Sequence, residues 1–336
     1  MKLEGKITTI LANFYYVQDL SNKVWECFAR GRILKEGKQL FVGDAVEIET
    51  SNDLQGVITS LGARKNKLSK PSVANIDQVL VTFSTCEPDF DFYNIDRYLS
   101  FIRYELPYEE IIICMNKIDL KKINIDETYK DSKYEIYYVS ALTKEGLEIL
   151  ASKLINKATV LTGPSGVGKS SLIKALAPEE DILTGSLSAI KQGKHITRNV
   201  RLIPINYKND IGFLVDTPGF TQFSFASLNP HKILHTFDEL NNTGCSFTNC
   251  LHNGEEGCKL TNNDLIPKSR HESYLRILNE AKEEIIYDTK DESKTKSVGG
   301  NKKSKSKLIP KIDELLRIKS RKKEKQELRR LDEENS

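Results

Sequence analysis

About the first 70 residues are divided into short segments in which hydrophobic and polar positions alternate. Asn, Asp, Gly and Ser, which favour turns, separate these segments from one another. An alternating pattern places the apolar side chains on one face of a strand. The pattern therefore predicts five short strands, at residues 5–10, 14–18, 24–30, 45–49 and 55–59. Five strands of this length favour a small closed barrel.

The hydrophobic pattern changes at about residue 75. Short apolar segments now alternate with segments of helical periodicity, which predicts a mostly parallel α/β sheet. Strands are expected at residues 79–83, 111–115, 136–139, 159–161, 201–205 and 213–215. Helices are expected at residues 93–104, 144–155 and 169–176. After about residue 225 the pattern predicts a helix, a cysteine-rich loop and a last helix at about 268–285.

The chain has 336 residues, which suggests two or three domains at about 150 residues each. Its longest apolar runs, such as residues 110–115, are far shorter than the roughly 20 residues that span a bilayer. No membrane association is therefore expected. The first residues include Glu4 and alternate in polarity, unlike the apolar core of a secretion signal. These features predict a cytoplasmic protein.

The barrel region is rich in both aromatic and basic residues. Its aromatic residues are Phe14, Tyr15, Tyr16, Trp25 and Phe28, and the nearby basic residues are Arg30, Arg32, Lys35 and Lys38. On an OB-type barrel such a mixture could stack bases and neutralise phosphates. Alternate aromatic residues could equally fill the barrel core, and the sequence does not decide between these interpretations.

The net charge of +3 conceals a strongly basic tail. Residues 290–330 carry 16 basic and six acidic side chains, a net charge of +10. Such a run is typical of a solvated or disordered extension, and it would also suit a phosphate-rich partner.

One segment has the pattern of a phosphate-binding loop. The sequence GPSGVGKS at 163–170 matches G-x-x-x-x-G-K-[ST] between a predicted strand and a predicted helix. Its glycines allow the main chain to fold closely around phosphates. We expect Lys169 to bridge the β and γ phosphates and Ser170 to hold magnesium. The residues assigned to the loop are Gly163, Pro164, Ser165, Gly166, Val167, Gly168, Lys169, Ser170 and Ser171.

The sequence NKID at 116–119 indicates guanine as the base. It follows an apolar strand, at the end where ligands bind in open α/β sheets. The Asp119 carboxylate can accept hydrogen bonds from the ring N–H and amino group of guanine, whereas adenine has no such donor pair. Asn116 would support the loop and the base, and the Lys117 stem would cover the purine.

Two shorter motifs also follow predicted strands. In DTPG at 216–219, Asp216 is expected to reach magnesium through water and the Gly219 amide to sense the γ phosphate. In the pair Ser140-Ala141, the Ala141 amide could contact the guanine oxygen. Neither motif is specific alone, but the position of all these motifs at strand ends strengthens their joint assignment.

The order of these motifs is unusual. Ordinary GTPases have the phosphate loop first, then a switch threonine, D-x-x-G, N-K-x-D and S-A. Here the order is NKID, SA, GPSGVGKS, Thr197 and DTPG, so the domain is circularly permuted. In this respect the chain resembles the RsgA family of GTPases that depend on the small ribosomal subunit. The resemblance covers about residues 1–287 and extends to RGRILK (30–35), VGDAVEI (42–48), PSVANIDQVLV (71–81), NIDRYL (94–99) and GKHITR (193–198).

The resemblance implies a multidomain architecture. The expected parts are an OB-fold RNA-binding barrel at 1–70, a circularly permuted P-loop GTPase domain at 71–225 and a mainly helical zinc domain at 226–287. The tail at 288–336 departs from the family and is expected to be disordered or helical. The implied function is GTP hydrolysis on the maturing small subunit and its rRNA, followed by release as the GDP form. Nothing in the sequence requires more than a monomer.

Hydrolysis requires a group that orients water. Phe220 follows DTPG where Ras-like proteins have a glutamine, so slow intrinsic turnover is expected. Family resemblance assigns the water-orienting or base role to His195, which could alternatively be an exposed loop histidine. Ile196 stands where the family commonly has a threonine, and the magnesium contact is assigned to Thr197.

Four clustered side chains predict a structural zinc site. Cys245, Cys250, His252 and Cys258 offer three thiolates and one imidazole within 14 residues. Four protein ligands fill a tetrahedron and leave no position for catalytic water. The other cysteines are scattered singly, so no disulfides are expected. On the last helix, Arg270 with Lys268, His271 and Arg276 suggests a basic face that contacts RNA or solvent.

Two other functions remain open at this stage. GPSGVGKS also resembles the P-loop of guanylate kinases, although NKID and DTPG oppose a kinase. Alternatively, the protein could be an RNA-binding scaffold that bound nucleotide stabilises and in which hydrolysis is incidental.

Overall fold

The computed structural model describes a barrel, a central sheet with helices and a carboxyl-terminal helical part. The described residues are 1–31, 33, 39–50, 54–68, 72–178, 200–216, 223–226, 228–241, 245, 249–262, 266–291, 296–297 and 308–309. His195, Thr197, Gly219, Phe220 and most of the tail therefore lie outside the described residues. In the part that is described, no helix is both long and apolar enough to cross a membrane.

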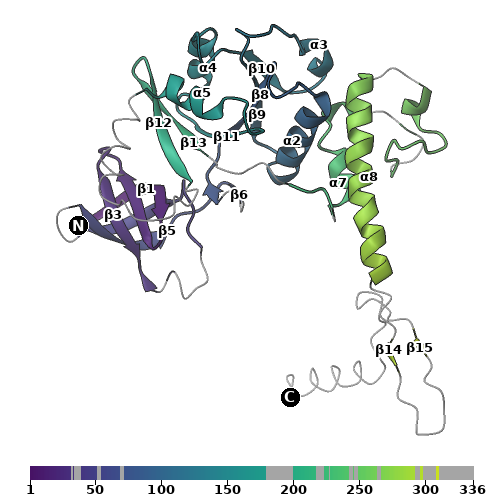
Figure 1. The fold of residues 1–336 in the computed structure, drawn as a ribbon. Coiled ribbons are helices and arrows are strands. Elements are labelled where there is room, and N and C mark those ends of the chain that lie inside the picture. Colours follow the sequence, from purple (N-terminus) through teal and green to yellow (C-terminus); the bar gives the residue numbers. More distant parts are fainter. Residues whose placement is uncertain are drawn as a thin grey trace.

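The amino-terminal region forms the predicted five-stranded barrel (Figure 1). Its strands are β1 (Lys2–Leu11), β2 (Phe14–Asp19), β3 (Val24–Ala29), β4 (Ala45–Thr50) and β5 (Gln55–Leu61). The strand order is β1-β2-β3-β5-β4, and β4 pairs back onto β1 to close the barrel. Among these five described barrel strands, β3 and β5 pair in parallel and the other neighbouring strands are antiparallel. The five expected strands are thus confirmed, each within three residues of its expected ends.

The aromatic residues of the barrel are divided between its inside and its outside. Trp25 is 8% exposed and belongs to the barrel core, against which Tyr15 packs. Phe28 is 47% exposed and its ring lies 4.8 Å from that of Phe14. Core packing is therefore confirmed for Trp25, whereas base stacking by the exposed Phe28 stays a prediction. Arg32, Lys35 and Lys38 lie outside the described residues.

The central sheet contains the six strands expected after residue 75. Its order is β10 (Glu135–Tyr138), β9 (Glu110–Asn116), β8 (Gln78–Ser84), β11 (Ala158–Thr162), β13 (Asp210–Asp216) and β12 (Arg201–Tyr207). The strands are parallel except for β12, which is antiparallel to β13 and joined to it by a two-residue turn. Thr9 of β1 pairs with Arg201 of β12, which joins the barrel to the edge of this sheet.

Helices cover both faces of the central sheet, which explains its continuous apolar strands. On one face, α2 (Phe92–Glu105) packs through Ile95, Leu99 and Ile102. On the other face lie α4 (Leu147–Leu154) and α5 (Lys169–Leu176). The short α3 (Asp126–Tyr129) precedes β10 and has no periodic signal in the sequence. Helix α4 begins later than predicted, because residues 140–146 form hydrogen-bonded turns that end at Gly146 with φ +75°.

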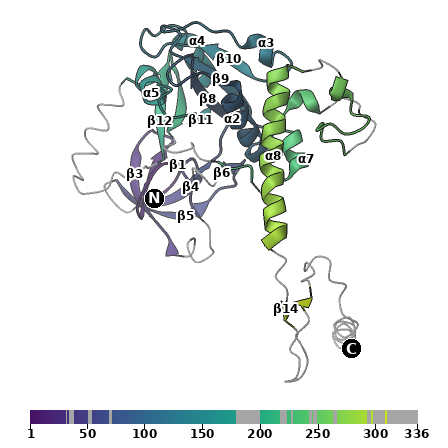
Figure 2. The same ribbon diagram turned by 45° about the vertical axis from the view of Figure 1, so that its right-hand side comes forward.

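The carboxyl-terminal part has its own core and lies against α2. Helix α8 (Lys268–Asp291) runs beside α2 and α7 (Pro230–Leu234), as both views show (Figure 1, Figure 2). Two short 3-10 helices, η1 (Asp238–Leu240) and η2 (Lys259–Asn262), flank the cysteine-rich loop. Small strand pairs complete the described elements: β6 (Lys67–Leu68) with β7 (Val73–Ala74), and β14 (Lys296–Ser297) with β15 (Leu308–Ile309).

Arg270 corrects the expected basic face of the last helix. Its side chain is 1% exposed and forms ion pairs with Asp96 of α2 at 2.5 Å and Glu239 of η1 at 2.6 Å. Breaking such a buried pair would leave an uncompensated charge, so this cluster ties α8 to α2. Arg276 is exposed, and its guanidinium lies 3.4 Å from the Tyr93 ring centroid. The expected basic face of RNA or solvent contact is therefore wrong for Arg270, whereas Arg276 lies at the surface.

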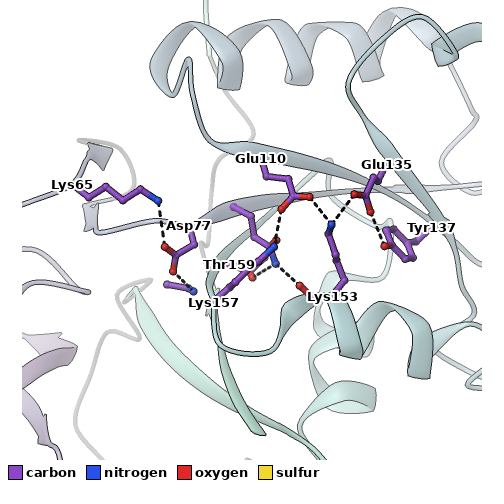
Figure 3. Close-up of polar contacts among 10 residues, drawn as sticks. Lys65, Asp77, Glu110, Glu135, Tyr137, Lys153, Lys157 and Thr159 are labelled. Atoms are coloured by element: carbon purple, nitrogen blue, oxygen red, sulfur yellow. Dashed lines mark hydrogen bonds and ion pairs between the residues drawn. The ribbon is translucent and has the colours of Figure 1, made fainter.

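A polar network supports the amino-terminal edge of the central sheet (Figure 3). Lys157 Nζ lies 2.8 Å from Glu110 and 2.9 Å from Gln78, and Lys153 Nζ lies 2.7 Å from both Glu110 and Glu135. Burial favours a higher pKa for Glu110, but hydrogen bonds from the two lysines outweigh it and lower that pKa. The network fixes the start of β11, the strand that leads into the phosphate-loop motif.

Candidate functional site

The GPSGVGKS segment forms the turn between β11 and α5. Gly163, Gly166 and Gly168 have φ values of +141°, +83° and +94°, which side chains with a Cβ rarely adopt. A Cβ on Gly163 would lie 2.0 Å from the carbonyl oxygen of Thr82, and one on Gly168 would lie 2.4 Å from Asn116 Nδ2. The glycines of the motif are therefore required by the conformation of the loop.

Lys169 lies inside the curve of this loop. Its Nζ donates hydrogen bonds to the carbonyl oxygens of Gly163 at 2.7 Å and Pro164 at 2.6 Å. Burial lowers the pKa of Lys169, although the charge of Asp216 opposes this shift. Burial likewise raises the pKa of Asp216, although the positive charges of Arg201 and Lys169 act to lower it. The ammonium and the carboxylate thus face the same confined space, where a bound polyphosphate and a cation would favour both charges.

Asn116 joins three of the motifs that the sequence predicts. It ends β9 and is 2% exposed. Its Nδ2 donates to the carbonyl oxygen of Val167 in the phosphate loop at 2.9 Å, and its Oδ1 accepts from the Ala141 amide at 3.0 Å. A single buried amide therefore fixes the relative positions of NKID, GPSGVGKS and the Ser140-Ala141 pair.

The residues next to Asn116 are arranged around an open edge. Lys117 has φ +67°, and its Nζ donates to the carbonyl oxygen of Glu87. Asp119 is exposed, so its carboxylate is accessible to a ligand. Ser140 is fully buried, and its Oγ accepts from the Thr143 amide at 3.0 Å. Ser140 therefore shapes the turn that presents Ala141.

A cavity of about 310 Å³ lies against the outer side of the phosphate loop. Its lining includes Pro164 and Ser165 of the loop, Asn94 and Arg97 of α2, and Phe223. Sequence reasoning did not assign these last three residues to the site. The available signal was the NIDRYL segment at 94–99, which contains both Asn94 and Arg97. Ser170 and Ser171 are exposed in the first turn of α5.

The four predicted metal ligands come together at the other end of the molecule. The Sγ atoms of Cys245, Cys250 and Cys258 lie 3.5, 3.6 and 3.4 Å from His252 Nδ1, and all four atoms lie within 4.8 Å of one another. Bonds of about 2.3 Å to sulfur and 2.0 Å to nitrogen at tetrahedral angles would separate S and N by about 3.5 Å. The cluster therefore has the size and donor set of a tetrahedral metal site.

A second layer of contacts orients these ligands. Glu255 accepts from the amides of Leu251 at 3.0 Å and Asn253 at 2.7 Å, which holds the ligand loop together. The His252 ring also hydrogen-bonds to the backbone of Leu240, and the Lys259 amide lies 3.4 Å from the Cys245 sulfur. Such partners hold metal ligands in one orientation. The four potential ligands are thus held in one arrangement that could bind a metal ion.

Comparisons with known proteins cover most of the chain. The family models described as RsgA N-terminal domain and RsgA GTPase match residues 4–58 and 61–226. Proteins named small ribosomal subunit biogenesis GTPase RsgA from Bacillus pumilus and Clostridium botulinum are 36% and 37% identical, over 83% and 86% of this chain and 98% and 99% of theirs.

Two solved structures have a similar fold. YjeQ from Thermotoga maritima matches with a TM-score of 0.70 and 29% identity, over 83% of this chain and 98% of that chain. YloQ, described as a circularly permuted GTPase, matches with a TM-score of 0.66 and 27% identity, over 84% and 96%. Proteins of known structure therefore share this fold, and one of them is described as circularly permuted.

Proposed function

This chain belongs to the RsgA family of GTPases, and we propose that it binds the small ribosomal subunit and hydrolyses GTP to GDP and phosphate during late maturation of that subunit. The subunit stimulates hydrolysis, and the protein leaves in the GDP form. We place this function in the cytoplasm and assign it to a monomer. The names of the relatives support the partner, and the site described above supports the reaction.

The bridging role of Asn116 is the observation that carries this proposal. A guanine-binding motif, a phosphate loop and a base-contacting amide are useful only if they face one nucleotide. The two hydrogen bonds of Asn116 bring all three within its reach. A guanylate-type kinase has no need of this arrangement, and neither does a scaffold in which nucleotide is incidental.

We assign base selection to Asp119 and Ala141. The exposed Asp119 carboxylate accepts the two N–H groups on one edge of guanine. The Ala141 amide, which donates to Asn116 Oδ1 in this structure, would share this hydrogen with the guanine oxygen. The stem of Lys117 lies along the purine face. A site built from such fixed hydrogen-bonding groups rejects a base that leaves them unpaired.

We assign phosphate binding to the main chain of residues 163–171, with Lys169 stabilising the charge that develops during transfer. Ser170 and Asp216 would hold magnesium, which neutralises phosphate charge when bound. From the sequence, Thr197 is assigned a magnesium contact and the Gly219 amide a contact with the γ phosphate. Both residues lie outside the described residues. Phe220 cannot orient water by hydrogen bonding, so that role is proposed for His195.

We propose that the metal is one structural zinc ion and that residues 226–287 form the domain built around it. The closed Cys₃His set leaves no place for substrate. Residues 1–70 are proposed to bind rRNA and residues 71–225 to form the GTPase domain. The exposed Phe28 and its neighbour Phe14 offer the barrel a surface on which a base can stack. The basic tail at 288–336 is a further candidate for RNA contact.

Phosphate release from GTP and ATP, with and without purified small subunits, tests the proposed function. We expect a low GTP rate alone, a strong rise with small subunits, and no comparable use of ATP. Equal use of ATP would contradict the guanine site. A GTP rate that small subunits do not change would contradict the proposed partner, and phosphoryl transfer to GMP would indicate a kinase.

Asp119→Asn is expected to exchange guanine for xanthine specificity. The side-chain amide of Asn would point an N–H group at the amino group of guanine, so that two donors would face each other. Xanthine has a carbonyl oxygen in place of that amino group, and this oxygen can accept the hydrogen bond. We expect hydrolysis of GTP to fall and that of XTP to rise, each by about a hundredfold. Rates at subsaturating nucleotide measure this change. Asp126→Asn, a carboxylate in α3 beyond the motif, is the control. Unchanged GTP preference in the Asp119 variant would remove Asp119 from base recognition.

A further inference from the structure

Two charged side chains hold the main chain just after the DTPG motif. Arg97 of α2 and Glu280 of α8 form an ion pair through Arg97 Nη1 and Glu280 Oε2. Arg97 Nη2 also donates to the carbonyl oxygen of Phe223 at 3.2 Å. Glu280 Oε1 accepts from the Phe225 amide at 3.1 Å. The pair therefore binds one carbonyl oxygen and one amide of this short segment, with one partner from each helix.

Aromatic packing reinforces these contacts. The Phe223 ring stacks on Phe101 with centroids 4.6 Å apart and meets Tyr98 edge-on at 4.9 Å. The Arg97 guanidinium lies 5.5 Å from the Phe223 centroid and 5.3 Å from that of Phe225, which is fully buried. Because the Arg97 and Glu280 side chains are only 22% and 29% exposed, water weakens their charge-assisted hydrogen bonds little.

The anchored segment lies next to the phosphate loop. Phe223 and Arg97 line the same 310 Å³ cavity as Ser165, the third residue of GPSGVGKS. Asp216 ends β13 inside the central sheet, and six residues separate it from Phe223. The described residues on either side of this interval are therefore held at two places, Asp216 by the sheet and Phe223 by the Arg97–Glu280 pair.

We propose that Arg97 and Glu280 are positioning residues for GTP hydrolysis. They hold Phe223 and Phe225, the first described residues after Asp216 to be bound in this way, beside the cavity that Ser165 also lines. Because Glu280 belongs to α8, this position depends on the docking of the metal-binding part against α2. The proposal rests on the GTPase activity and does not depend on which partner stimulates it.

Arg97→Ala is expected to lower kcat about tenfold while leaving KM for GTP and the Kd of GDP within about twofold. The reason is that a shift of Phe223 beside Ser165 would disturb the alignment of groups during phosphoryl transfer more than the ground-state binding of nucleotide. Arg276→Ala is the matched control, because it removes a second α8–α2 contact, the stacking on Tyr93, and leaves Arg97 and Glu280 in place. Equal losses of kcat in both variants, or a parallel rise in KM and Kd, would overturn the proposal.

A charge swap separates positioning from simple stability. The double variant Arg97→Glu with Glu280→Arg can restore the ion pair between the helices. However, a carboxylate at 97 cannot donate to the Phe223 carbonyl, and a guanidinium at 280 cannot accept from the Phe225 amide. We expect the swap to recover the Tm lost in Arg97→Ala but not the kcat. Recovery of kcat together with Tm would show that the pair only stabilises the fold.

Discussion

The Lys169→Ala protein is expected to hydrolyse GTP at least about a hundredfold more slowly than the wild type, with its fold intact. Nζ of Lys169 lies within hydrogen-bond distance of two carbonyl oxygens of the phosphate loop, so the ammonium is already at the centre of the loop. Removing it takes away the nearest positive charge from a transfer in which negative charge shifts between phosphate oxygens. Phosphate release at saturating small subunits measures the effect.

Lys174→Ala is the matched control for this change, since Lys174 is exposed in the last turn of the same helix. It should leave turnover and Tm close to the wild type. A Lys169→Ala protein that keeps more than about a tenth of the wild-type rate would contradict the assignment of the phosphate loop. If the variant loses hydrolysis but keeps RNA affinity and biological activity, the scaffold interpretation gains support.

Removal of the metal is expected to unfold the cysteine-rich loop and to reduce the stability of the carboxyl-terminal part by several kcal/mol. Structural zinc contributes about 10–16 kcal/mol of binding free energy in isolated zinc-finger peptides. Here Cys250 and Cys258 also belong to the buried core beneath α8, where Phe237 and Tyr274 pack edge to face. Because that core remains without metal, we expect α8 to stay partly docked and the loss to be smaller than in those peptides.

Two treatments distinguish the metal from its ligands. A strong chelator removes the ion without altering a side chain, whereas Cys258→Ser removes one ligand. Both should release about one zinc per chain, lower Tm and expose the loop around Cys250 to protease. Cys86→Ser, a single cysteine in the loop after β8, is the control for loss of a thiol. Full retention of Tm and protease resistance after chelation would contradict a structural metal.

Local chemistry made much of this molecule predictable. Alternation of polarity reports which side of a strand is buried, so the barrel strands follow from the sequence. Short continuous apolar segments indicate strands covered on both faces, so the six strands of the central sheet follow as well. The phosphate loop follows for a related reason, since Gly163 and Gly168 must adopt backbone angles that other residues avoid. The ligand spacing from Cys245 to Cys258 also lies within one short segment. In each case the informative residues lie close together in the chain.

The contacts between those segments are determined by the tertiary structure. Arg270 looks like a solvent-facing cation in sequence, but it is buried because Asp96 lies opposite it when α8 docks on α2. Arg97 and Glu280 are 183 residues apart, and no periodicity relates them. The bridging contacts of Asn116 likewise require three strand ends to meet at one edge of the sheet. Such pairings depend on which elements pack against each other in the folded chain. The spacing of residues along the sequence does not specify that packing.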